Sequence, residues 1–147
     1  AEDRIYVAER GAHRIRRFSP GGRITTVAGT GVRGVPQDNS DAQLASLNEP
    51  MGLALDSAGD LYFADRSNNA LRAVNARTGR LRTLIANLRA PESVAVSPNG
   101  TVYFSESTAH TISRLAPNGA REVIAGRPGE NGLNAENGDA TALTLNE

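Results

Sequence analysis

The chain of 147 residues contains neither cysteine nor tryptophan, and all of its sixteen basic residues are arginine. Without cysteine it can form no disulfide, no thiolate zinc site and no cysteine nucleophile. The absence of lysine excludes a P-loop for phosphate binding, and the Gly-x-Ser-x-Gly elbow of α/β-hydrolases is also missing. No apolar run approaches the ~20 residues that are needed to span a bilayer.

A charge excess of either sign is absent too, because sixteen acidic residues balance the arginines. A general attraction to nucleic acid or to an anionic membrane is therefore not expected. Arg14, Arg16 and Arg17 form the densest basic cluster, but strand alternation divides them between two faces. The first four residues do not resemble a signal peptide. We expect a soluble protein, for which secreted and cytoplasmic locations both remain open.

Internal repetition is the strongest positive signal in the sequence. The three tyrosines occupy one position of a recurring segment at residues 4–9, 60–65 and 101–106. Each segment is followed by a turn and two further strand-like stretches. The second and third segments are preceded by one more, at 50–56 and 91–97. Hydrophobic residues alternate with period two, and Asn-Gly pairs at 99–100 and 118–119 predict hairpin turns. The sequence therefore predicts an all-β chain with four antiparallel strands per repeat.

Spacing between the repeats supports this architecture. Tyr62 and Tyr103 are 41 positions apart, within the ~40–45 residues of a four-stranded propeller blade. The first interval is longer because 21 positions separate Gly29 from Pro50. Residues 39–49 and 137–147 also echo each other, which predicts that both long connections are ordered.

Across residues 27–72 the succession of motifs resembles the NHL-repeat family of β-propellers. These motifs are Ala-Gly, a Gly-rich loop, Asp-Ala, Leu-Asn, Pro-x-Gly, Ala-x-Asp, Gly-x-Leu-Tyr, Ala-Asp, Asn and a hydrophobic-Arg pair. The resemblance implies one propeller segment over residues 1–147. Its blades would be about 1–29, 50–87 and 91–126, with long loops at 30–49 and 127–147. Members of this family include scaffolds, sensors, ligand binders and enzymes, so the resemblance does not fix an activity.

Three blades are too few for a closed ring, and the first lacks an inner strand equivalent to residues 50–56. Two apolar blade faces would then be exposed to water. We therefore expect a homodimer in which two half-rings complete a six-bladed propeller. An excised piece of a longer propeller and an engineered half-propeller remain as alternatives.

Loops on a rigid frame often carry function, and both long loops fall on one face of the predicted disc. An unidentified protein or small ligand could bind there or in the central channel. The candidate residues are those of the shorter turns on the same face: Glu9, Arg10, His13, Asp65, Arg66, Asn69, Glu106 and His110.

For most of these residues a structural role is favoured over a chemical one. The acids at positions 9, 65 and 106 could form a carboxylate ring, but we expect them to accept backbone N–H groups in the turns that follow them. His13 and His110 could bind metal, yet Asn69 interrupts the series, and we expect turn residues. Asp38, Asn39, Asp41, Asn137 and Asp139 could bind calcium, but Asx-turns explain them equally well.

The sequence thus predicts a non-catalytic scaffold or binding module without a catalytic residue, cofactor or metal. A fragment of a metal-dependent lactonase- or lyase-like propeller is the alternative. Such enzymes hold a cation with polar residues on inner strands, whereas residues 53–55 and 94–96 are all apolar here.

Overall fold

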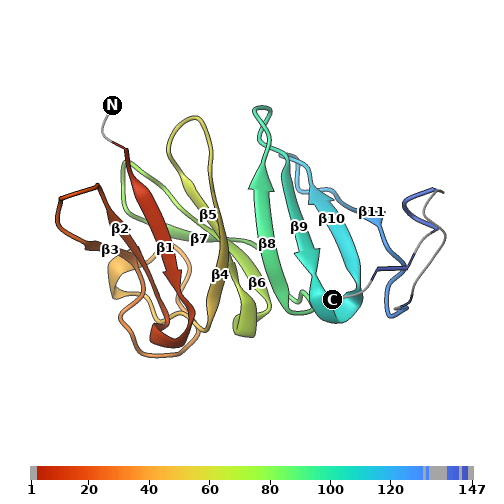
Figure 1. The fold of residues 1–147 in the computed structure, drawn as a ribbon, viewed down its shortest axis with the longest axis horizontal. Helices are drawn as coiled ribbons and strands as arrows, with labels where there is room; N and C mark the ends of the chain where they lie inside the picture. Colours follow the sequence, from red (N-terminus) through yellow and green to blue (C-terminus); the bar gives the residue numbers. More distant parts are fainter. Residues whose placement is uncertain (1–2, 131, 133–138, 143, 146–147) are drawn as a thin grey trace.

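The computed structural model describes residues 3–130, 132, 139–142 and 144–145. Within these residues the chain forms three antiparallel sheets that stand side by side in chain order (Figure 1). The predicted all-β class and the three-stranded first blade are both confirmed. Among the same residues, no helix is long and apolar enough to cross a membrane.

Each sheet is a simple meander, which we call a blade. Blade 1 contains β1 (Ile5–Glu9), β2 (Arg14–Phe18) and β3 (Thr25–Ala28). Blade 2 contains β4 (Pro50–Leu55), β5 (Leu61–Asp65), β6 (Ala70–Val74) and β7 (Leu81–Ile85). Blade 3 contains β8 (Pro91–Val96), β9 (Val102–Glu106), β10 (Thr111–Leu115) and β11 (Arg121–Ala125).

The hydrophobic core lies between blades, because alternate side chains of each strand face opposite neighbours. Leu61 and Phe63 of β5 pack toward blade 1, in a cluster that also contains Ile15. Tyr62 and Ala64, at the intervening positions, pack in a second cluster with residues of blade 3. Every blade therefore depends on a neighbour on each side to bury its two faces.

The sheets approach one another closely at β4 and β8. A Cβ atom added at Gly52 of β4 would collide with the carbonyl oxygen of Glu92 and would lie 2.7 Å from the Cα atom of Ser93. Only glycine permits this approach of the two backbones. Blades 2 and 3 therefore pack backbone against backbone at their inner strands.

Candidate functional site

The predicted site residues lie on and around three short turns at the lower edge of the blades in Figure 1. Each turn is a single 3₁₀ helix: η1 (Arg10–Ala12), η3 (Arg66–Asn68) and η4 (Ser107–Ala109). All three end at a residue with left-handed backbone, namely His13 (φ 49°), Asn69 (φ 52°) and His110 (φ 54°). This conformation is tolerated best by Gly, Asn, Asp and His, which accounts for the residue types at this position.

The side chains of His13 and Asn69 also accept hydrogen bonds from the connections that lead to the next blade. The backbone N–H of Glu49 donates to Nδ1 of His13 at 3.2 Å, and that of Ala90 donates to Oδ1 of Asn69 at 3.1 Å. Nδ1 of His110 is buried and has no hydrogen-bond partner among the described residues. The shared position is therefore a blade junction in at least two of the three repeats.

The acids at the ends of β5 and β9 accept backbone N–H groups, as predicted. The donors, however, do not belong to the turns that follow these acids. The N–H of Asn48 donates to Oδ1 of Asp65 at 2.8 Å, and the N–H of Arg89 donates to Oε1 of Glu106 at 2.9 Å. Neither acid caps the 3₁₀ turn that follows it. The prediction was wrong about the donor, because both donors belong to the connection that precedes the blade. Each buried carboxylate thus joins two successive blades.

An arginine neutralises each of these buried carboxylates. In blade 2, Nε of Arg72 on β6 lies 2.6 Å from Oδ2 of Asp65. In blade 3, Ser113 takes the position of Arg72, and the partner of Glu106 is instead Arg121 from β11. The same ion pair is therefore built from different strands in the two blades. Sequence reasoning missed Arg121, although a serine in the arginine position was a signal of the exchange.

Glu9, the equivalent acid of blade 1, stands at an open edge. It forms ion pairs with Arg14 and, at 3.9 Å, with Arg16, and 29% of its side chain is exposed. Among the described residues, no backbone N–H donates to it, whereas Asp65 and Glu106 each have such a donor. Blade 1 therefore has the carboxylate that accepts a backbone N–H between blades, but the described residues do not provide the N–H donor.

Arg10 and Arg66 belong to a chain of ion pairs that runs across the turn face. Glu49 lies 3.1 Å from Arg10 and 3.6 Å from Arg66, and Arg66 also pairs with Glu92 at 3.0 Å. The hydroxyl of Ser67 donates to Glu49 at 2.8 Å. This hydrogen bond, followed by that from Arg10, lowers the pKa of Glu49. Arg10 and Arg66 are therefore both already paired with carboxylates.

The first long connection (residues 30–49) packs along the outer strand of the next blade. Asp38 accepts the N–H of Thr83, and Leu81 exchanges backbone hydrogen bonds with Asn39 and Ser40. Asp41 caps a one-turn 3₁₀ helix, η2 (Ala42–Leu44), by accepting from the N–H of Gln43. Among the described residues, no group of three or more acids or histidines is placed to hold a metal ion.

The second long connection repeats this geometry where it is described. The N–H of Gly126 donates to the carbonyl of Ala140 at 3.0 Å, as Gly29 donates to Ala42 at 2.9 Å. Asp139 accepts from the N–H of Thr141 in the manner of an Asx-turn, and its pKa is lowered mainly by the hydroxyl of Thr141. Asn137, another residue considered as a calcium ligand or an Asx-turn residue, lies outside the described residues.

Blade 1 exposes an apolar face that the equivalent positions of the other blades bury. Ile5 and Val7 of β1 are 42% and 38% exposed, whereas Leu61 and Phe63 at the same positions of β5 are 2% and 0% exposed. This face of β1 points away from blade 2. It is the half of a blade interface that would receive a preceding blade.

Blade 3 exposes the other half of such an interface. Ile112 of β10 is 38% exposed, whereas Ile15 and Leu71 at the same position are fully buried against the next blade. The two ends of the chain therefore present complementary halves of one repeated interface.

Comparison with known proteins shows the fold and not a family. No family model matches the chain. A segment of Teneurin-m from Drosophila melanogaster is 32% identical over 160 residues, which covers 84% of this chain and 6% of Teneurin-m. The chloroplastic protein SUPPRESSOR OF QUENCHING 1 from Arabidopsis thaliana is 33% identical over 79 residues, covering 53% of this chain and 7% of that protein. The chain thus spans less than a tenth of the length of these relatives.

Similar solved structures are β-propellers with diverse functions. Virginiamycin B lyase from Staphylococcus aureus superposes with a TM-score of 0.61 at 18% identity, over 84% of this chain and 38% of the lyase. A chain of a nidogen–laminin complex gives 0.66 at 20% identity, over 85% and 44%. A putative gluconolactonase gives 0.62 at 20% identity, over 82% and 44%. The chain therefore has the fold of a partial β-propeller: three blades, the first of which lacks its inner strand.

Proposed function

We propose that this protein is a non-catalytic propeller scaffold that self-associates, so that two three-bladed chains complete a six-bladed ring. The observation that carries the proposal is the pair of complementary open faces. Ile5 and Val7 occupy the receiving positions of blade 1, and Ile112 occupies the inserting position of blade 3. Burial of such apolar surface is the dominant driving force for association.

Two-fold symmetry satisfies both faces at once. Blade 3 of one copy would pack on blade 1 of its partner, and the reverse contact would form on the other side of the ring. Each new interface would repeat the arrangement already present between blades 1 and 2, where Ile15 packs in one cluster with Leu61 and Phe63. The ring would cover Ile5, Val7 and Ile112, whereas the inner strand β8 would face no inner strand of blade 1, which has only three strands.

The polar contacts of the turn face favour a structural role over catalysis. Asp65 and Glu106 are buried and ion-paired, and His13 accepts a backbone N–H. Groups that a hydrolytic or lyase-type propeller would use for acid–base or metal chemistry are thus engaged in joining blades. Stoichiometric binding of calcium or zinc by the purified protein would favour the enzyme alternative instead.

Sedimentation analysis of two matched valine variants tests the self-association. We expect the wild-type chain to sediment at twice 15.5 kDa and Val7→Arg to sediment as a single chain. Val35→Arg should remain a dimer, because Val35 is 77% exposed on the first long connection and belongs to neither open face. Far-UV circular dichroism should show the same β content in all three proteins.

Two results would overturn the proposal. One is a wild-type chain that stays monomeric at every concentration, which would mean that its two open faces do not associate. The other is a Val7→Arg variant that dimerises as well as Val35→Arg does, because the dimer would then use a different surface.

A further inference from the structure

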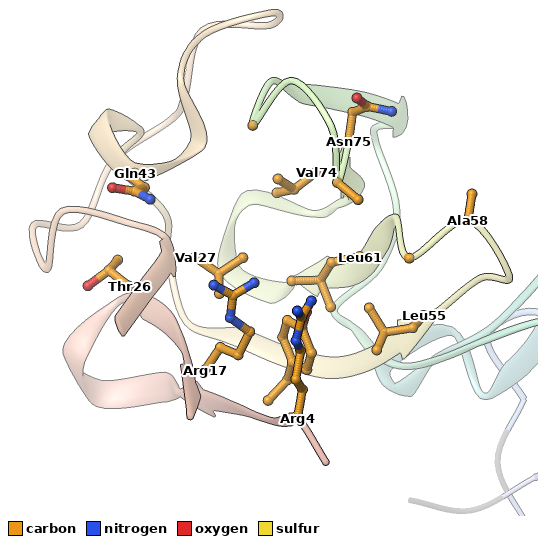
Figure 2. A pocket seen from close by; sticks show the side chains of 14 residues that line it. Arg4, Arg17, Thr26, Val27, Gln43, Leu55, Ala58, Leu61, Val74 and Asn75 are labelled. Atoms are coloured by element: carbon orange, nitrogen blue, oxygen red, sulfur yellow. The ribbon is translucent and has the colours of Figure 1, made fainter. Parts of the chain in front are cut away.

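A cleft of about 440 Å³ lies between blades 1 and 2, at the edge opposite η1, η3 and η4. Arg4, Tyr6 and Arg17 line it from blade 1, and Leu61 and Val74 line it from blade 2. Figure 2 shows the guanidinium groups of Arg4 and Arg17 turned into the cleft beside Leu61. Two cations therefore share a cleft that is lined by apolar side chains and also by the polar side chains of Thr26, Gln43 and Asn75.

Arg4 has no acidic partner among the described residues, although its repeat position is acidic in blade 2. There Asp60 accepts the N–H of Ala76 and the side-chain amide of Asn75, and so stabilises the turn after β6. Arg4 cannot accept a hydrogen bond, so blade 1 does not reproduce this turn contact. The change from Asp to Arg adds a positive charge at the edge of the cleft.

Arg17 likewise lacks the carboxylate that its counterpart has in blade 3. Arg114 occupies the same position, and its Nη2 lies 2.6 Å from Oε2 of Glu122 on the neighbouring strand. The residue across from Arg17 is Thr25, which donates its hydroxyl to the carbonyl of Arg17 and leaves the guanidinium unpaired. In a chain with no net charge, the cleft thus holds two unneutralised guanidinium groups.

The corresponding cleft between blades 2 and 3 differs in this respect. Its one arginine, Arg82, lies with its guanidinium carbon 6.0 Å from the centre of the Tyr62 ring. The presence of two arginines without a carboxylate partner is therefore specific to the first cleft and does not recur in every repeat. Formation of the ring would not cover that cleft, because the ring contact uses the opposite face of β1. Arg4 and Tyr6 face blade 2, whereas the alternating residues Ile5 and Val7 face away from it.

We propose that this cleft binds a small organic carboxylate. Its carboxylate group would lie between Arg4 and Arg17, since a guanidinium group forms paired, charge-assisted hydrogen bonds with carboxylate oxygens. Its apolar body would rest on Val27 and Leu61, which line the wall beside the two arginines. A free small acid and the C-terminal carboxylate of a peptide share this chemistry.

An NMR titration of the arginine Nε–H signals tests the site with phenylacetate as the probe. We expect saturable shifts of the Arg17 signal, with phenylacetamide binding about tenfold or more weakly because it lacks the charge. Arg17→Gln should weaken phenylacetate binding by a similar factor. Arg89→Gln should leave it unchanged, because Arg89 is an exposed residue on the connection between blades 2 and 3.

A second arm separates the two sources of carboxylate. A tetrapeptide with a free C-terminus that binds more tightly than phenylacetate, and loses binding when its C-terminus is amidated, would identify a peptide ligand. Weaker binding of that peptide would identify a free small acid. Equal binding of phenylacetate and phenylacetamide, or equal affinities in Arg17→Gln and Arg89→Gln, would overturn the proposal.

Discussion

Replacement of Arg72 by methionine would measure how much the buried ion pair stabilises blade 2. Arg72 is 4% exposed and Asp65 is fully buried. Removal of one partner from a buried pair costs about 3–5 kcal/mol, because a charge is left uncompensated. Asp65 would keep the donors Asn48 and Asn68, each at 2.8 Å. We therefore expect the lower end of that range, about 3 kcal/mol.

Urea unfolding followed by circular dichroism would give this free energy of unfolding. A loss of about 3 kcal/mol is a large part of the 5–15 kcal/mol that holds a typical domain folded. Arg114→Met is the matched control, since Arg114 and Glu122 are 48% and 59% exposed and such a pair contributes about 0–1 kcal/mol.

A double variant, Asp65→Asn with Arg72→Met, separates the charge from the packing. It should be more stable than Arg72→Met alone, because no unpaired carboxylate remains in the interior. If Arg72→Met were no more destabilising than Arg114→Met, the pair would not have the role assigned to it.

Three further predictions concern the inner strands, the turn face and the first long connection. Gly52→Ala should destabilise the chain strongly in urea unfolding because its new Cβ would collide with the β8 backbone, whereas Gly11→Ala should not, since nothing lies within 4 Å. Ser67→Ala should raise the pKa of Glu49 in an NMR titration, because the Ser67 hydroxyl lowers that pKa. In the wild-type chain, the lowered pKa of Glu49 stabilises the fold at pH values above the unfolded-state pKa, and this contribution is lost as the pH falls through the folded-state pKa. Leu47→Ala should cost about 2–5 kcal/mol in the same unfolding assay, because Leu47 is fully buried in the core.

Much of the fold could be predicted because each blade repeats the same alternation of buried and exposed residues. The missing strand of blade 1 and the hairpins followed from this periodicity. Details of the hairpins did not: Gly100 and Gly119 have left-handed backbone, but the asparagines before them do not. Asn99 and Asn118 instead accept backbone N–H groups two residues ahead.

The candidate site was harder to predict because its contacts join segments that are distant in the sequence. The backbone donors to Asp65 and Glu106 lie 17 residues before them, so their positions depend on how one blade packs on the next. The cleft could not be predicted from the sequence for a similar reason. The lack of a carboxylate partner for Arg17 depends on strand pairing, which places Arg17 opposite Thr25 and Arg114 opposite Glu122.

Small-angle X-ray scattering of the wild-type chain tests ring completion most directly, because it reports mass and shape together. The account predicts a particle of twice 15.5 kDa with the compact, flat outline of a closed disc. A particle of 15.5 kDa with an open arc shape, or an elongated dimer joined through another surface, would contradict it.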